Sequence, residues 1–274
     1  MMEYVMEDQA AGLRRILSAV RPRVLAIVPC GVVTTSWVAD QLVRRPRSGA
    51  GRRTLVLDEW ETYGNLGDCL GMVSRFDLLQ AATGEIEIPA CVLERGDGLG
   101  VVRVAALARA LGQDRVVSRR CLKVLGALQA GFDDWLLMSR FDPLEGGFSA
   151  LTLAAAHVML ALDDQPKSAT LAWAALSRLR KLNPGARFSV CAGNPGQHAQ
   201  AVQASFCALA RARLGLRVDA VGALEQAFGG ILRKGGVFSD SFMGRLIQTS
   251  HGQADGLFGG GIPGIAADDG LRVP

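Results

Sequence analysis

Short apolar segments alternate with helical patterns over most of this chain. The segments are continuous rather than alternating between apolar and polar residues, which is typical of strands buried on both faces of a sheet. Seven of them stand at Val24–Val28, Thr54–Asp58, Leu99–Val104, Trp135–Met138, His157–Leu162, Arg187–Cys191 and Leu216–Val221. Helical patterns include Thr35–Arg44, Ser168–Leu182 and Gln197–Leu214. The order predicts an α/β fold: a doubly wound, mostly parallel sheet with helices on both faces.

The two ends of the chain depart from this pattern. Residues 1–21 contain one amphipathic segment, Asp8–Val20, whose apolar face carries Leu13, Ile16, Leu17 and Val20. Residues 248–274 are rich in glycine and proline and have no sustained period, so we expect a flexible tail there. The chain is therefore divided into an N-terminal helix (1–21), an α/β domain (22–247) and a tail (248–274).

The N-terminal segment needs a surface on which to dock. A helix of about 13 residues that includes a glycine is marginal alone in water. Its apolar face has two alternatives: it covers the chain's own domain, or it binds a partner protein.

Charge and composition restrict the class of partner. The chain has 30 basic and 26 acidic residues, a net charge of +4. No block of five like charges occurs, so nothing in the sequence requires a nucleic acid or a membrane surface. The longest nearly apolar run, Leu151–Leu162, is too short to span a bilayer. We expect a cytoplasmic protein that binds no nucleic acid.

Cysteine and histidine residues are scattered. The six cysteines form no CxxC pair, and the three histidines lie far apart in the sequence. This spacing argues against a metal centre and against a disulfide framework.

Residues 8–14, DQAAGLR, resemble the DQAxxLR motif at the N-terminus of FlhG, a family of MinD/ParA-like ATPases that help to set flagellar number and placement. Further segments agree in order, among them VLAIVPCGVVTTSW, LVLDEWETYGNLGDCLG, RFDLLQAATGEI, GFDDWLLMS and GLRVDAVGAL. Together they cover residues 8–240, and some of them are similar to divergent betaproteobacterial members.

The resemblance implies a partner for the N-terminal helix. In this family the helix binds the GTPase FlhF and stimulates GTP hydrolysis, and the corresponding residues here are Asp8, Gln9, Ala10, Leu13, Arg14 and Leu17. Flagellar switch proteins or a transcriptional regulator are further candidate partners. The resemblance also suggests recruitment to the cell pole.

The expected nucleotide loop departs from the family pattern KGGVGK[ST]. Residues 29–36 read PCGVVTTS, so Cys30 and Thr35 replace the two lysines, and only Gly31 and the hydroxyl of Ser36 remain. The first lysine of the chain is Lys123, so no shift of the alignment supplies one. A second KGGV sequence, at 234–237, has the features of a turn after a helix. Because lysines neutralise phosphate charge, we expect ATP hydrolysis to be lost.

Two acidic positions of the family are also altered. Asp58 remains at the end of the second predicted strand, but Trp60 stands at the second acidic position and Met138 replaces the aspartate that follows the family's Walker B strand. A methionine fills core space and does not coordinate magnesium. These changes predict a pseudo-ATPase that needs no cofactor.

Two alternatives remain open from the sequence. Gly31, Thr34, Thr35, Ser36 and Asp58 could form a vestigial site that binds ATP and magnesium weakly, through a helix N-terminus. The chain could also be an active MinD-like ATPase with an unorthodox loop, which dimerises on ATP.

The C-terminal part of the domain has a short apolar face. It carries Phe238, Phe242, Met243, Leu246 and Ile247. Arg245 is the only base between Phe238 and Ile247, whereas an interfacial helix needs several bases and a longer apolar stripe. We therefore expect this face to pack against the domain, with weak membrane contact or none.

Overall fold

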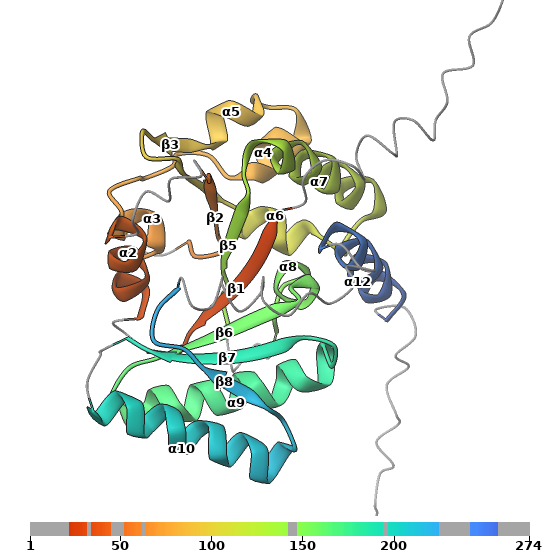
Figure 1. Cartoon of the computed structure of the whole chain (residues 1–274). Helices are drawn as coiled ribbons and strands as arrows, with labels where there is room; N and C mark the ends of the chain where they lie inside the picture. Colours follow the sequence, from red (N-terminus) through yellow and green to blue (C-terminus); the bar gives the residue numbers. More distant parts are fainter. Residues whose placement is uncertain are drawn as a thin grey trace, which may run out of the picture.

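A single mixed sheet forms the centre of the molecule (Figure 1). The structure is a computed structural model that describes residues 22–31, 34–44, 52–61, 64–141, 147–193, 197–224 and 242–256. Its 8-stranded sheet has the order β3-β4-β2-β5-β1-β6-β7-β8. The strands are β1 (Arg23–Pro29), β2 (Thr54–Asp58), β3 (Leu93–Arg95), β4 (Leu99–Arg103), β5 (Asp134–Met138), β6 (His157–Leu162), β7 (Arg187–Ala192) and β8 (Val218–Ala220).

Helices connect the strands. Short helices lie between β2 and β3, and longer ones precede β5, β7 and β8. They are α2 (Thr34–Arg44), α3 (Leu66–Cys69), α4 (Leu78–Thr83), α5 (Ile88–Cys91), α6 (Ala105–Ala110), α7 (Arg115–Leu128), the 3-10 helix η1 (Gln129–Gly131), α8 (Ala150–Ala154), α9 (Pro166–Leu182), α10 (Gln197–Leu214) and α12 (Phe242–Gly256).

The sheet confirms the predicted fold class. Each of the seven predicted strands is present, and all of these pair in parallel. The additional strand β3 runs antiparallel to β4 at one edge of the sheet. β3 is only three residues long and half exposed, so it lacks the continuous apolar run that revealed the other strands.

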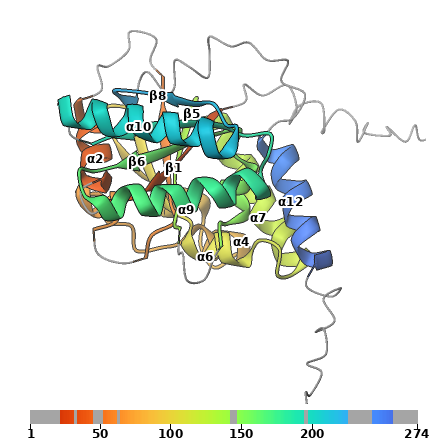
Figure 2. The same ribbon diagram turned by 90° about the horizontal axis from the view of Figure 1, so that it is seen from below.

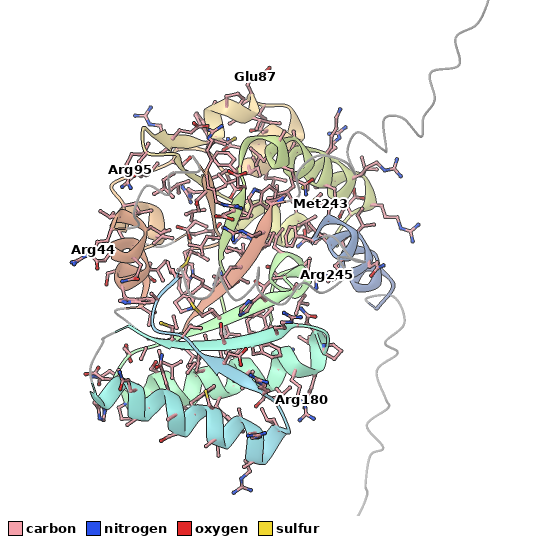
Figure 3. The ribbon with its side chains drawn as sticks, viewed as in Figure 1. Arg44, Glu87, Arg95, Arg180, Met243 and Arg245 are labelled. Atoms are coloured by element: carbon pink, nitrogen blue, oxygen red, sulfur yellow. The ribbon has the colours of Figure 1, made fainter. Side chains whose placement is uncertain are left out.

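Both faces of the sheet are covered, but unequally (Figure 2). Successive β1 residues alternate between two apolar clusters, and both sets are buried. One face packs against α4, α6, α7, α8, α9, α10 and α12. The described helices that pack on the other face are α2, through Val38 and Leu42, and α3, through Leu66. The long polar side chains Arg44, Glu87 and Arg180 point away from this framework (Figure 3).

Helix α12 packs its apolar face against α7 and α8, as predicted, through Phe242, Met243 and Leu246, whereas Phe238 of the predicted face lies outside the described residues. Phe242 and Leu246 are buried, Phe242 lies edge-on to Trp135 at 5.9 Å between ring centroids, and Met243 is half-buried at the start of the helix (Figure 3). Ile247 is 40% exposed and lies outside this contact. In the described chain, no helix is long and apolar enough to cross a bilayer.

The expected start of the flexible tail at residue 248 is wrong, because α12 continues to Gly256. The helix extends because its buried face continues with Ser250, which is 2% exposed and donates a hydrogen bond to the Ile247 carbonyl. Ser250 lies one helical turn after the buried Leu246, and because serine is polar there is no apolar signal at this position in the sequence. Residues 257–274, the predicted helix within 1–21 and the turn at 234–237 lie outside the described residues.

A buried carboxylate joins the amino ends of the central strands. Asp134, at the start of β5, has no exposed surface and makes two hydrogen bonds of 2.6 and 2.7 Å with the guanidinium of Arg23 in β1. Arg52, just before β2, donates a further bond of 3.1 Å. Bidentate guanidinium–carboxylate geometry is directional, so this cluster fixes the register of the three central strands β1, β2 and β5 at their amino ends.

We expect Asp134→Ala to lower the free energy of unfolding by about 3–5 kcal/mol, because it leaves the nearly buried guanidinium of Arg23 without this carboxylate. Urea denaturation measures the change. Asp40→Ala is the matched control, because the Asp40–Arg44 pair is exposed and contributes at most about 0.5 kcal/mol. Equal effects of the two substitutions would contradict the prediction.

Candidate functional site

The junction between β1 and α2 is where a phosphate-binding loop would stand. The amide of Cys30 donates to the Ala161 carbonyl at 2.8 Å, so the end of β1 is held against the end of β6. Gly31 follows, residues 32 and 33 lie outside the described chain, and α2 begins at Thr34. The strand, turn and helix therefore have the predicted order at the carboxyl edge of the sheet.

The hydroxyl of Thr34 is already used inside this turn. Thr34 is fully buried, and its Oγ1 donates to the Gly31 carbonyl at 2.6 Å. Of the three hydroxyl residues predicted for a vestigial anion site, Thr35 is half-buried and Ser36 is exposed. The structure therefore brings the three residues to one helix N-terminus, where the Thr34 side chain is buried inside the turn.

A carboxylate of the chain itself lies against Gly31. Asp163 follows directly after β6 and is 5% exposed. A β-carbon built on Gly31 would overlap the carboxyl carbon and Oδ2 of Asp163 and would stand 2.7 Å from Oδ1. Oδ1 also accepts a hydrogen bond from the Gln165 amide at 3.0 Å, which fixes the orientation of the side chain. The space beside Gly31 is thus filled by an acidic group.

The neighbouring thiol is affected by the same carboxylate. Cys30 is buried, and burial raises the pKa of its thiol far above the usual range, with the negative charge of Asp163 adding to the increase. Cys30 therefore stays a neutral thiol and supplies none of the positive charge that a lysine supplies at this position in the family pattern.

Asp58 is a structural anchor at the end of β2. Its side chain is 1% exposed, and its two oxygens accept the amides of Trp60 and Gly67, each at 3.1 Å. Burial raises the pKa of Asp58 to about 6, partly offset by these hydrogen bonds and by the charge of Arg103. Because both oxygens hold backbone amides, Asp58 connects β2 to the start of α3 rather than presenting a free carboxylate.

The replaced acidic positions lie where the sequence predicted them. Met138 ends β5, pairs with Ile27 on one side and Asp58 on the other, and is fully buried. Trp60 is partly buried against the same apolar cluster and donates its indole N–H to the Ser139 carbonyl at 3.3 Å. Apolar side chains thus occupy the centre of the carboxyl edge.

A cleft of about 160 Å³ opens beside Asp58, between β2, β4 and the segment that follows α3. The Arg103 guanidinium lines it and donates to the Ser74 carbonyl at 3.4 Å, and Val73 at the rim is 67% exposed. No group of three or more metal-ligating side chains occurs within the described ranges.

Sequence reasoning missed Glu59 and Asp163, two buried acids at the carboxyl edge. Glu59 is 4% exposed and accepts hydrogen bonds from the Arg140 amide at 3.0 Å and from the Ser149 hydroxyl. A signal existed for both: each acid stands directly after the last residues of a predicted strand. Such residues meet at one edge of a parallel sheet, but the sequence does not tell which of them turn inward.

Comparisons with known proteins agree with the fold and go no further. No family model matches the chain, and no curated protein matches it either. The solved complex of a Cyanothece McdA variant with ATP is similar, with a TM-score of 0.50 and 16% identity over 90% of this chain and 99% of that one. Aquifex aeolicus MinD also has a TM-score of 0.50, with 15% identity over 88% and 98% of the two chains. The chain therefore has the fold of MinD-type P-loop ATPases.

The described residues of the β1–α2 junction, Cys30, Gly31 and 34–36, offer no cationic side chain to a nucleoside triphosphate. Phosphate binding on this fold needs a positive end of a helix, free amides and cationic side chains. Here the Asp163 carboxylate lies beside Gly31, the Thr34 hydroxyl is bonded within the turn, and Met138 replaces a carboxylate. No catalytic step through ATP or magnesium follows from this arrangement.

We expect Gly31→Ala to lower the free energy of unfolding by about 1–3 kcal/mol, because the new methyl group overlaps the Asp163 carboxylate. In an Asp163→Ala background the same substitution should cost less than about 1 kcal/mol, which a double-mutant cycle measures. Gly126→Ala, in open space on α7, is the control and should stabilise by up to about 1 kcal/mol. Additive effects of the Gly31 and Asp163 substitutions would refute the packing described.

Proposed function

We propose that this chain is a regulatory protein that acts through protein–protein contacts on a MinD-type fold, with ATP hydrolysis lost. The observation that carries the proposal is the Asp163 carboxylate against Gly31. A negative charge buried beside the turn that follows β1 would oppose phosphate binding there, because like charges at short distance repel strongly when water is excluded. The replacement of both loop lysines acts in the same direction.

The particular role we infer is that of an FlhG-type regulator of flagellar number and placement. The support comes from residues 8–14, DQAAGLR, and from the order of the segments that follow. In this role the N-terminal helix binds the GTPase FlhF, with Leu13 and Leu17 on the apolar face and Gln9 positioned to orient water near the bound GTP. The α/β domain then carries and positions this helix.

A second candidate function is an active ATPase that dimerises on ATP. The observation that favours it is the similarity of the fold to the McdA variant, which was solved as a complex with ATP. Thr35 and Ser36 would then contact phosphate at the start of α2. Light scattering distinguishes the two functions, because only an ATP-binding chain would double its mass when Mg-ATP is added.

We expect calorimetry to detect no binding of Mg-ATP at micromolar concentration. Each missing charge-assisted contact is worth about 1.5–3 kcal/mol, or roughly tenfold or more in affinity. Asp163→Asn removes the repulsive charge with little change in volume and should raise the affinity for Mg-ATP without restoring hydrolysis. Asp164→Asn is the matched control, because this neighbouring acid is exposed and should leave the affinity unchanged.

Micromolar binding by the unmodified chain, together with ATP turnover, would overturn the proposal and favour the second candidate. Equal affinities of the Asp163→Asn and Asp164→Asn variants would remove Asp163 as the cause of weak binding.

For the partner, we expect the full chain to stimulate GTP hydrolysis by FlhF, and a chain without residues 1–20 to have no effect. Gln9→Ala should reduce the stimulation by about tenfold or more, because a residue that positions water acts in the transition state. Phosphate release in single-turnover reactions measures this.

The control is Gln113→Ala, which changes an exposed glutamine between α6 and α7. Equal stimulation by the full and shortened chains would exclude the N-terminal helix as the activator, whatever the result with ATP.

A further inference from the structure

Glu59 joins three segments that lie far apart in the sequence. Its amide donates to the Met138 carbonyl at 3.1 Å, which extends the pairing of β2 with β5 by one residue. Its Oε2 accepts the amide of Arg140, just after β5, and its Oε1 accepts the hydroxyl of Ser149, the N-cap of α8. One buried carboxylate therefore connects the end of β5 to the start of α8, and we call this contact the β5–α8 junction.

A polar network surrounds this carboxylate. The Ser149 hydroxyl also accepts the Thr152 amide at 3.1 Å, and the Thr152 hydroxyl donates to the Ser139 hydroxyl at 2.7 Å. Ser139 in turn accepts the indole N–H of Trp60 through its carbonyl. These hydrogen bonds connect the ends of β2 and β5 with the first turn of α8. Ionisation of Glu59 therefore affects the hydrogen bonding of all three segments.

Two aromatic rings pack beside the same junction. Phe141 and Phe148 stack with 4.7 Å between their ring centroids and an interplanar angle of 13°, and both side chains are buried. Phe141 follows Arg140 directly, and Phe148 directly precedes Ser149. The β5–α8 junction therefore has two layers, one polar and one aromatic.

Few charges compensate Glu59. Asp58 on β2 acts on it as a like charge, and Arg140 after β5 as an opposite charge. Helix α8, Ala150–Ala154, carries no titratable residue. Glu59 makes no ion pair with a described residue, so backbone and hydroxyl donors alone hydrogen-bond its negative form.

We propose that Glu59 is a proton-responsive latch, which holds the β5–α8 junction together in mildly acidic solution and loosens it as the pH rises to neutrality. The physical basis is the cost of burying a negative charge that has hydrogen bonds but no ion pair with any residue that the structure describes. Separating the end of β5 from the start of α8 exposes the carboxylate to water, which stabilises its ionised form.

The direction of the response follows from linkage. Burial, as the largest effect, raises the pKa of Glu59 to about 7 in the closed form, against 4.5 for an exposed glutamate. The closed junction is therefore fully favoured below the exposed value, weakens as the pH rises between the two values, and changes little above 7. A partner would meet a different surface in the two states, whether or not that partner is FlhF.

Hydrogen exchange of the full chain tests the latch, with the Arg140 amide as reporter because it donates directly to Glu59. After correction for intrinsic exchange, the protection of this amide should fall by at least about tenfold between pH 5 and pH 7.5. The reason is that Glu59 has a higher pKa in the closed form than in the open form. An amide within β6 serves as reference for global opening. Protection of Arg140 that is independent of pH, relative to this reference, would overturn the proposal.

Glu59→Gln keeps an acceptor for the Arg140 amide but cannot ionise, so it should retain protection and lose the pH dependence. Glu87→Gln is the matched control, because Glu87 is exposed at the start of α5 and makes no side-chain cap bond (Figure 3). The same pH dependence in the Glu59→Gln variant would also overturn the proposal.

Ser149→Ala provides a second variant. The Ser149 hydroxyl lowers the pKa of Glu59, so its removal should shift the pH at which protection levels off to a higher value. No shift, or a shift to lower pH, would contradict the latch even if Glu59→Gln fails to fold.

Discussion

The carboxylate of Asp163 fills the space beside Gly31 at the carboxyl edge of this sheet. On a parallel sheet with helices on both faces, ligands bind where the strands end. Here the Asp163 side chain, which follows directly after β6, fills the position next to Gly31. The Gln165 amide fixes its orientation. The apolar strands that form the fold lie below this edge.

Much of the fold could be predicted because strands that are buried on both faces of a sheet appear in the sequence as continuous apolar runs. The seven parallel strands are continuous apolar runs, and each was found in its predicted place. β3 and the one- to two-turn helices α3 to α6 left no such record, since elements of this length bury only a few side chains each. The extension of α12 was missed because Ser250, a small polar residue, continues its buried face.

The site was predictable in outline but not in its contacts. The sequence placed Gly31, Asp58 and Met138 at the ends of neighbouring strands, and the structure brings them there. It did not reveal that Asp58 would bind two backbone amides, that Thr34 would turn inward, or that Asp163 and Glu59 would be buried. These outcomes depend on side-chain rotamers and on segments distant in the sequence, which a local pattern does not encode.

Buried carboxylates are stabilised differently at the amino and carboxyl ends of the strands. This difference is one reason why we propose a regulator rather than an ATPase. At the amino edge, Asp134 is neutralised by two guanidinium groups, so its burial adds to structural specificity. At the carboxyl edge, Asp58, Glu59 and Asp163 rely on amide and hydroxyl donors, and no described ion pair joins them. A phosphate would bring more negative charge to an edge where these three acids are already buried. A partner protein can instead bind surfaces elsewhere on the same framework, and the junction held by Glu59 gives that framework a part that responds to pH.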